Sequence, residues 1–311
     1  MRKNILIIGS GSWGTALAIV ASYSNNKVFL KTRKQQLCGK INNSRHSPYL
    51  ENVIIPASIE AVMEFPIDID LVIFAVPSEY LLEQLEEALS KLGLNIDIII
   101  ATKGMRNEGE LFSAYFKRKW GIELIFLSGP NFAREVANGL KSACDIVCTD
   151  IKKAKKVADY LTSDHFEIKT GSDIVSIQIA GCYKNVLAIY SGYISVLGFG
   201  ENYKAKICTD GINELGFICE RLGGEKESIY SYSGIGDLIL SSYSVESRNY
   251  RFGTFIAKQE KNNSILQQYS GVIEGIVASK SLPKLCKSFY NELTILPKVT
   301  SLIENFENKK L

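Results

Sequence analysis

A glycine-rich motif near the amino terminus is the first pattern in the sequence that could carry chemistry. The residues G-S-G-S-W-G at 9–14 follow an apolar run at 4–8 and precede a stretch with helical spacing at 14–23. In this context Gly9 permits a tight turn, Gly11 lets the backbone approach a pyrophosphate, and Gly14 allows close helix packing. Unpaired N–H groups at the helix start would face the anion. A purely structural turn is the alternative, and the flanking elements favour dinucleotide binding.

The end of the second expected strand bears on which dinucleotide is bound. NAD-binding sites usually carry an Asp or Glu there, about 20 residues beyond the glycines, for the ribose hydroxyls. Here 30–34 reads L-K-T-R-K, without a carboxylate. Arg33, with Lys31 or Lys34, could instead hold a 2′-phosphate, so we expect NADP(H) to be preferred and NAD(H) to be accepted. The alternative is that these are ordinary surface cations.

Three further segments follow expected strands, where the ligands of open α/β sheets collect. They are V-P-S at 76–78, A-T-K-G at 101–104 and S-G-P-N-F-A at 128–133. Lys103 could meet an anionic substrate, and Gly129 leaves backbone accessible. Turn chemistry is the alternative for the prolines among them.

One lysine stands in surroundings that could tune its acidity. Lys184 lies in a segment with helical spacing, Q-I-A-G-C-Y-K-N-V at 178–186, whose residues are largely apolar. Such surroundings destabilise an ammonium and lower its pKa toward working pH, which would suit a general acid and base. A lone helical lysine is more often a surface residue, so that alternative stays open at this point.

The elements that must position these residues fall into two groups. Up to about residue 170, apolar β-branched runs alternate with helical spacing, which predicts a Rossmann-type, doubly wound parallel sheet and a dinucleotide-binding domain at 1–171. Beyond it, helical spacing predominates and predicts a mainly α-helical domain for substrate binding and catalysis at 172–311. The expected strands are 4–8, 27–31, 70–75, 97–101, 123–128 and 143–148, and the expected helices are 14–23, 79–91, 109–119, 131–138, 174–195, 203–222 and 271–290.

Composition excludes several classes of function. The 311 residues are 46% hydrophobic with a net charge of +3, and the basic run at 152–156 resembles a solvated helix face, so we expect no nucleic-acid partner. No apolar run is long enough for a membrane span. The seven cysteines are scattered without a C-x-x-C pair, which indicates a reducing compartment and no metal site. We therefore expect a cytoplasmic protein, which could form a homodimer.

Six motifs, in order along the chain, resemble those of the bacterial NAD(P)-dependent glycerol-3-phosphate dehydrogenase family. They are G-S-G-S-W-G-T-A at 9–16, A-T-K-G at 101–104, S-G-P-N-F-A-R-E at 128–135, K-N at 184–185, G-I-G-D-L at 234–238 and S-R-N-Y-R-F-G at 247–253. The match continues through V-I-E-G at 272–275 and weakens toward the carboxyl end. Each motif alone would be weak, whereas their combination is specific. The sequence departs from the family at 208–211, C-T-D-G, where many relatives carry Arg.

The resemblance implies an oxidoreductase that interconverts dihydroxyacetone phosphate and sn-glycerol 3-phosphate and supplies the latter for glycerophospholipid synthesis. It implies that Lys184 is catalytic, protonating the carbonyl oxygen as hydride arrives from the nicotinamide. The implied substrate-binding residues are Lys103, Gly129, Asn131, Lys184, Asp237, Ser247, Arg248 and Asn249. Together with the motifs above, it implies cofactor binding by Gly9, Gly11, Ser12, Trp13, Gly14, Arg33, Lys103, Ala133, Arg248, Val272 and Glu274.

Physical chemistry supports several of these roles. Asp237 could accept a hydrogen bond from a substrate hydroxyl or orient Lys184, and the planar fork of Arg248 suits a phosphate. Glu274 could reach the nicotinamide amide. Without the family match, these would read as a turn or cap residue, an exposed loop residue and a solvated helix residue.

Two other functions remain open from the sequence. One is a reductase of the same two-domain plan that acts on a 3-hydroxy acid or a ketoacid, because a fold alone does not fix the substrate. The other is a cofactor-binding sensor without enzymatic activity. The set of Asp237 and 247–249 argues against the first, and Lys184 argues against the second.

Overall fold

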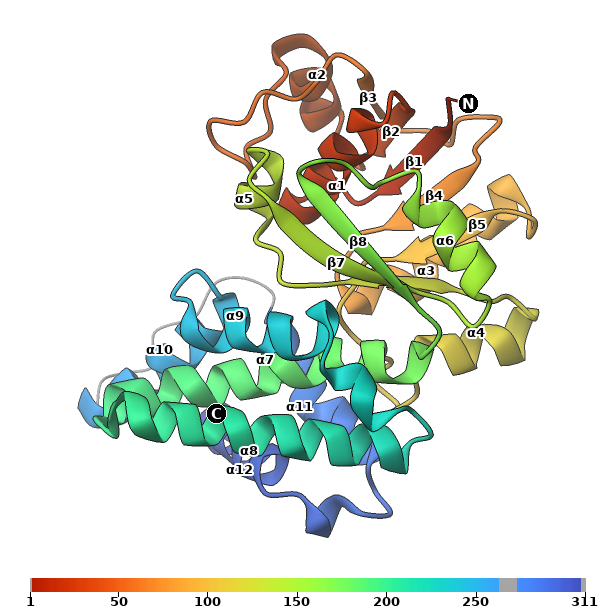
Figure 1. Cartoon of the computed structure of the whole chain (residues 1–311). Helices are drawn as coiled ribbons and strands as arrows, with labels where there is room; N and C mark the ends of the chain where they lie inside the picture. The colour runs from red at the N-terminus through yellow and green to blue at the C-terminus, as the bar shows by residue number, and fades with distance from the viewer. Residues whose placement is uncertain (1, 263–272, 309–311) are drawn as a thin grey trace. The chain divides into compact units, whose positions relative to one another are not determined.

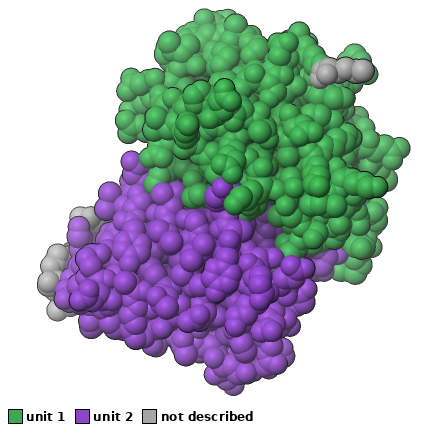
Figure 2. Space-filling model, in the orientation of Figure 1, with its two compact units in different colours: residues 1–102, 116–174 green, residues 103–115, 175–311 purple. Residues whose placement is uncertain are grey.

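The chain forms two compact units. The structure, a computed structural model, describes residues 2–262 and 273–308. Residues 1–102 and 116–174 group into one unit, and residues 103–115 and 175–311 into the other (Figure 2). We predicted domains of 1–171 and 172–311; in the structure the segment 103–115 groups with the helical residues.

The first unit is built on an eight-stranded sheet, seen in Figure 1, with the strand order β3-β2-β1-β4-β5-β6-β7-β8. All neighbouring strands are parallel except β6 and β7. The inner strands are short apolar runs that are buried along nearly their whole length, as expected when helices cover a parallel sheet. The strands are β1 (Asn4–Ile8), β2 (Lys27–Lys31), β3 (Ile59–Val62), β4 (Leu71–Phe74), β5 (Asp97–Ile100), β6 (Ile125–Ser128), β7 (Ser142–Val147) and β8 (Phe166–Gly171).

Six helices lie between these strands in the sequence. They are α1 (Ser12–Tyr23), α2 (Gln35–Ser44), α3 (Ser78–Leu92), α4 (Phe112–Trp120), α5 (Ala133–Ala137) and α6 (Ile151–Ala158). Helix α1 is buried along most of its length beside the sheet, and its first residue directly follows the glycine-rich turn. The turn is therefore held between β1 and α1.

The predicted fold class is confirmed, with a few local differences. We did not predict β3, α2 or β8; β3 and β8 are the edge strands, of which β3 has only 4 residues and β8 alternates apolar with polar residues over its first half. The expectation of a parallel sheet is wrong at β7, which runs antiparallel to β6. The linking helix α5 has only 5 residues and packs against α1, so the chain returns without a full crossover.

The second unit is helical, as predicted. Its main helices are α7 (Ile174–Leu197), α8 (Gly200–Arg221), α9 (Asp237–Tyr243), α10 (Arg248–Asn262), α11 (Glu274–Leu285) and α12 (Ile295–Asn308), with short helical turns at Lys226–Ile229, Tyr232–Gly236 and Tyr290–Glu292. Helix α7 is apolar nearly all round and is buried on most sides, which is how a helix at the centre of a bundle should read.

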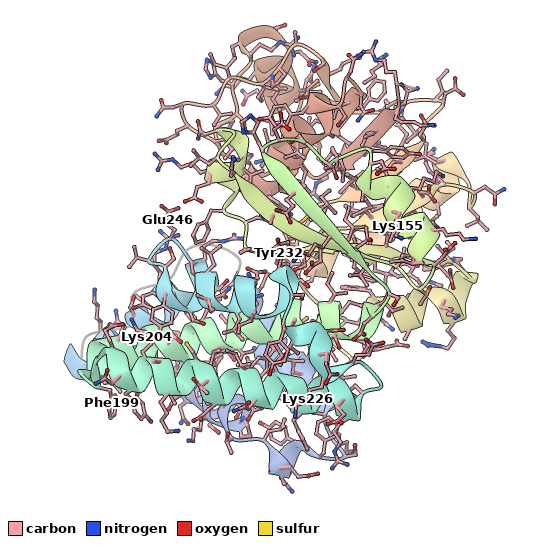
Figure 3. The ribbon with its side chains drawn as sticks, in the orientation of Figure 1. Lys155, Phe199, Lys204, Lys226, Tyr232 and Glu246 are labelled. Atoms are coloured by element: carbon pink, nitrogen blue, oxygen red, sulfur yellow. The ribbon has the colours of Figure 1, made fainter. Side chains whose placement is uncertain are left out.

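Two features complete the second unit. Met105 and Leu111, from the segment 103–115, belong to its core. Lys204 on α8, labelled in Figure 3, is buried and pairs with Glu201 at 3.0 Å.

Within the described ranges of the whole chain, no helix is long and apolar enough to cross a membrane.

Candidate active site

The turn between β1 and α1 has the geometry of a phosphate-binding turn. Gly9 has φ of 111°, and a Cβ there would lie 2.5 Å from the carbonyl oxygen of Ala75. A Cβ at Gly14 would lie 1.7 Å from the carbonyl oxygen of Gly9, so neither position tolerates a side chain. At Gly11, by contrast, a Cβ would meet no protein atom within 4 Å. Only Gly11 therefore faces open space, where a ligand could approach the backbone.

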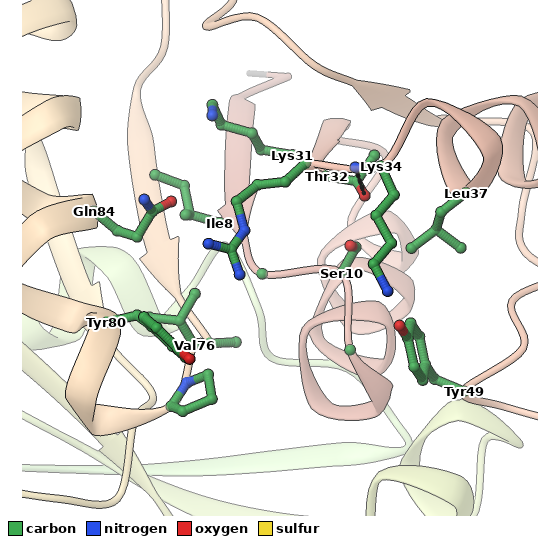
Figure 4. A pocket seen from close by; sticks show the side chains of 15 residues that line it. Ile8, Ser10, Lys31, Thr32, Lys34, Leu37, Tyr49, Val76, Tyr80 and Gln84 are labelled. Carbon is green, nitrogen blue, oxygen red and sulfur yellow. Dashed lines mark hydrogen bonds between the residues drawn. The ribbon is translucent and has the colours of Figure 1, made fainter. Parts of the chain in front are cut away.

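A pocket of about 290 Å³ lies beside this turn (Figure 4). Its walls come from the ends of β1, β2 and β4 and from the elements that follow them. The lining residues are Ile8, Gly9, Ser10, Gly11, Lys31, Thr32, Arg33, Lys34, Leu37, Tyr49, Ala75, Val76, Pro77, Tyr80 and Gln84. Its place beside the turn and at the carboxyl ends of parallel strands is where a dinucleotide binds in this class of sheet.

The cations of this pocket differ in what they contact. The Lys31 ammonium lies 3.7 Å from Glu87 Oε1 and 4.5 Å from the centre of the Phe65 ring. The Lys34 side chain points toward Ser10 and Tyr49 (Figure 4). The exposed Arg33 guanidinium lies 5.4 Å from the centre of the Tyr80 ring. The geometry therefore favours Lys34 over Lys31 as the partner of Arg33 in the predicted 2′-phosphate site.

Other residues expected at the cofactor site lie around the same turn. Ser12 begins α1 and donates a hydrogen bond to the carbonyl oxygen of Tyr49 at 2.9 Å. The buried Trp13 Nε1 has no hydrogen-bond partner among the described residues. Ala133 begins α5, and Val272 lies outside the described residues. Glu274 is half-buried at the first residue of α11.

Gly129 and Asn131 follow β6 in the first unit. A Cβ at Gly129 would lie 2.7 Å from the carbonyl oxygen of Ala143, so this glycine lets β6 approach β7. Asn131 donates from Nδ2 to the same carbonyl oxygen at 3.0 Å. Its buried Oδ1 has no partner among the described residues.

Four polar side chains of the second unit form a buried cluster around Asp237. The Lys184 ammonium donates to Asp237 Oδ1 at 2.8 Å and to Ser241 Oγ at 3.0 Å. The Lys103 ammonium donates to the other carboxylate oxygen, Asp237 Oδ2, at 2.6 Å. Lys184 is 8% exposed and Asp237 1% exposed. One carboxylate thus joins two ammonium groups that come from segments far apart in the sequence.

Burial and charge act in opposite directions on this cluster. Burial is the main influence on Lys184 and lowers its pKa to about 8; the Lys103 charge acts the same way, and the Asp237 charge opposes both. Burial alone would raise the pKa of Asp237, but the two ammonium groups outweigh it and hold that pKa below its usual value. Lys184 can therefore exchange a proton near neutral pH while Asp237 stays ionised.

The local fold explains how these groups meet. Lys184 lies on α7, whose apolar surface packs against its neighbours on most sides. Asp237 is the first residue of α9 and directly follows the helical turn Tyr232–Gly236. The preceding helical turn is fixed by Ser231, whose Oγ accepts a hydrogen bond from the Gly234 N–H at 3.1 Å. Ser241 stands one helical turn after Asp237 on α9.

The segment 247–249 lies at the start of α10. The Ser247 hydroxyl accepts from the Tyr250 N–H at 3.3 Å and so caps this helix. Arg248 is exposed. Asn249 donates to Asn185 Oδ1 at 2.7 Å and accepts from the Gly275 N–H at 3.0 Å, so its amide joins α7, α10 and α11.

Three residues of these sites were not predicted from the sequence. Ser241 and Asn185 lie next to predicted residues, one helical turn after Asp237 and one residue after Lys184. The K-N pair at 184–185 was a signal for Asn185, and the i,i+4 spacing from Asp237 was one for Ser241. Tyr49 lies in the loop after α2, where no motif marks it.

The fold and these sites define a class of protein. A doubly wound sheet with a G-x-G-x-x-G turn, and a helical unit with a buried lysine of lowered pKa, are the parts of a nicotinamide-dependent oxidoreductase. Among residues 2–262 and 273–308, no group of three or more His, Cys, Asp or Glu side chains could hold a metal ion.

Comparison with known proteins identifies the family. Residues 4–154 and 173–310 match the N-terminal and C-terminal family descriptions of NAD-dependent glycerol-3-phosphate dehydrogenase. Glycerol-3-phosphate dehydrogenase [NAD(P)+] of Rickettsia bellii is 33% identical over 309 residues, covering 97% of this chain and 98% of the relative. The chain therefore belongs to the NAD(P)-dependent glycerol-3-phosphate dehydrogenase family, and the resemblance seen in the motifs is confirmed.

Solved structures agree with this assignment. The crystal structure of glycerol-3-phosphate dehydrogenase from Coxiella burnetii matches with a TM-score of 0.87 at 25% identity, covering 98% of this chain and 95% of that one. A probable 2-dehydropantoate 2-reductase from Bacillus subtilis matches with a TM-score of 0.60 at 15% identity, covering 97% and 99%. The second match shows a shared fold alone.

Proposed function

We propose that this chain interconverts dihydroxyacetone phosphate and sn-glycerol 3-phosphate, with Lys184 as the general acid and base. The observation that carries the proposal is the buried cluster of Lys184, Asp237, Lys103 and Ser241, in a chain of this dehydrogenase family. A ketone reductase needs a proton donor whose pKa lies near the working pH. Lys184 is such a group.

The chemistry balances with one proton from the protein. When bound, the reduced nicotinamide supplies a hydride to C2 of the ketone and is oxidised. Lys184 gives its proton to the carbonyl oxygen, so the ketone becomes a secondary alcohol; in the reverse direction neutral Lys184 removes the hydroxyl proton. Asp237 holds the Lys184 ammonium in place, and Lys103 brings a second positive charge to the same carboxylate.

The phosphate end of the substrate needs cationic and N–H donors. Arg248 is exposed at the first residue of α10, where the backbone N–H groups of a helix start also favour an anion. Asn249 supports this segment through its bonds to Asn185 and Gly275. We assign Arg248 to the phosphate, with Ser247 and Asn249 shaping the helix start. Gly129 and Asn131 stay predictions as substrate-binding residues.

The proposal extends to the dinucleotide. The open face of Gly11 fits a pyrophosphate. The first turn of α1 contributes Ser12, Trp13 and Gly14, and Ala133 is the first residue of α5 in the same unit. Arg33 and Lys34 at the end of β2, without a carboxylate there, favour NADP(H) over NAD(H). Lys103, Arg248, Val272 and Glu274 stay predictions as cofactor contacts. A cytoplasmic location, a homodimer and a role in supplying glycerol 3-phosphate for glycerophospholipids belong to the same proposal.

A spectroscopic assay tests the reaction. We expect purified full-length protein to oxidise NADPH when dihydroxyacetone phosphate is added, and to do so more slowly with NADH. Lys184→Ala should abolish the turnover. Activity on a 3-hydroxy acid or a ketoacid instead would support a different reductase of this fold. Tight NADPH binding with no turnover on any of these substrates would support a sensor.

A further inference from the structure

The residues 103–115, which we call the strap, carry Lys103 at their first position. The strap follows β5 in the sequence, yet it groups with the helical unit. We propose that two strap residues, Met105 and Gly109, are positioning residues that hold the Lys103 ammonium on Asp237. This inference rests on the proposed roles of Lys103 and Lys184.

Met105 anchors the strap two residues from Lys103. Its side chain is 2% exposed and belongs to the core of the helical unit, together with Leu111 of the same strap. Lys103 itself lies over Gly181 of α7, where a Cβ would come 3.7 Å from Lys103 Cβ. Met105 therefore fixes the backbone from which the Lys103 side chain reaches Asp237.

Gly109 provides a second anchor against α11. It has φ of 79°, and a Cβ would lie 2.6 Å from Lys284 Cβ and 2.8 Å from the backbone nitrogen of Leu285. Lys284 also donates to the carbonyl oxygen of Asn107 at 2.7 Å. Any side chain at 109 must therefore push the strap away from α11 or strain the backbone.

Side-chain contacts also join parts of the strap to each other and to α7. Arg106 pairs with Glu110, and its guanidinium lies 3.7 Å from the centre of the Tyr115 ring. Gln178 of α7 donates to Ser113 Oγ at 2.8 Å and accepts from the Ser113 N–H at 3.2 Å. These contacts hold the strap on both sides of Gly109, so we expect a shift at one anchor to displace Lys103.

The position of Lys103 has a chemical consequence for Lys184. Two charged groups act on Lys184, Asp237 at the start of α9 and Lys103 on the strap, and Ser241 of α9 adds a neutral acceptor. A cation near Lys184 destabilises its protonated form. If Lys103 moves away, the Lys184 ammonium becomes a weaker acid, and the pH dependence of the reaction moves upward.

The test is the pH profile of kcat for glycerol 3-phosphate oxidation by the full-length protein. Lys103→Met, which removes the charge, should move the midpoint upward. Met105→Ala should move it in the same direction by about 0.5 in pH. Met105→Leu should keep the wild-type midpoint, since leucine nearly conserves the volume of the methionine side chain. Gly109→Ala, which removes no core side chain but displaces the strap, should reproduce the upward shift.

A matched core variant separates positioning from stability. Ile303→Ala removes a 1% exposed side chain of the same core on α12 and should lower thermal stability without moving the midpoint. Wild-type midpoints in both Met105→Ala and Gly109→Ala, with an upward shift in Lys103→Met, would overturn the inference alone. An unchanged midpoint in Lys103→Met would overturn the proposed coupling of Lys103 to Lys184, and the inference with it.

Discussion

Lys184 and Asp237 form an ion pair at 2.8 Å in which both side chains are almost completely buried. The carboxylate keeps the lysine from losing its charge altogether, and burial keeps the ammonium from being too weak an acid. Removing either partner of a buried pair leaves the other uncompensated. The pair therefore sets both the position and the acidity of the proposed proton donor.

The first prediction concerns pH. The pKa of Lys184 is lowered to about 8, so the protonated form prevails below that pH and the neutral form above it. Reduction of dihydroxyacetone phosphate needs the protonated lysine and should decline as pH rises through about 8. Oxidation of glycerol 3-phosphate needs the neutral lysine and should rise over the same range. Profiles of kcat in both directions check this, and parallel profiles would contradict it.

Asp237→Asn should shift these profiles downward. The substitution removes the negative charge that stabilises the Lys184 ammonium, so its pKa should fall further below the ordinary lysine value. We expect reduction of dihydroxyacetone phosphate at pH 7.5 to lose about 100-fold in kcat, since donor and orientation are both impaired. A profile that keeps its midpoint would show that Asp237 does not act on Lys184.

Cofactor preference should depend on Arg33 and Lys34. Each charge-assisted bond to a 2′-phosphate contributes about 1.5–3 kcal/mol, so Arg33→Ala should weaken NADPH binding about 10- to 100-fold and leave NADH binding nearly unchanged. Lys34→Ala should act in the same direction. Binding titrations with both cofactors measure the ratio.

Lys31→Met is the matched control for that experiment. Lys31 lines the same pocket, but its ammonium lies near Glu87 and the Phe65 ring. Because the Lys31 ammonium lies on these two groups, we expect the NADPH-to-NADH ratio of Lys31→Met to stay within about twofold of the wild type. The Lys31–Glu87 pair itself should contribute little, since the Glu87 side chain is only half-buried. A loss as large as that of Arg33→Ala would assign Lys31 to the phosphate.

The two glycines Gly11 and Gly14 should separate binding from folding. A Cβ at Gly11 meets no protein atom within 4 Å, so Gly11→Ala should keep the melting temperature and weaken dinucleotide binding. A Cβ at Gly14 would lie 1.7 Å from the Gly9 carbonyl oxygen, so Gly14→Ala should lower the melting temperature as well. Thermal unfolding and NADPH titration distinguish the two. Equal effects on stability would contradict the assignment of Gly11 to ligand approach.

The sequence allowed the fold class and the main chemical groups to be predicted, because their signals are local. The glycine turn follows a strand within a few residues, and Lys184 stands among apolar neighbours on its own helix. The edge strand β3 was missed because it is only 4 residues long, and β8 because polar residues separate its two large apolar side chains. The antiparallel pairing of β7 with β6 is a tertiary contact, and the residue pattern of neither strand reports its direction.

The cluster around Asp237 could not be derived from spacing. Lys184 and Asp237 are 53 positions apart, and Lys103 and Asp237 are 134 apart. Their meeting depends on the register of α7 against α9 and on the path of the strap. Ser241 enters the cluster for the same reason, because only the packed helices bring its hydroxyl to the Lys184 ammonium. The family resemblance supplied the grouping of the lysines with Asp237, and the packing of the helical unit gives it a geometry.

The most direct test of the central claim compares two buried lysines of the helical unit. Lys184→Met and Lys204→Met each remove a buried ammonium, but Lys204 pairs with Glu201 and not with Asp237. We would measure kcat for dihydroxyacetone phosphate reduction at saturating NADPH, with NADPH binding measured alongside. Lys184→Met should lose about 100- to 10,000-fold in kcat with NADPH binding unchanged, and Lys204→Met should stay within about threefold. Activity of Lys184→Met close to that of the wild type would contradict the assignment of Lys184 as the proton donor.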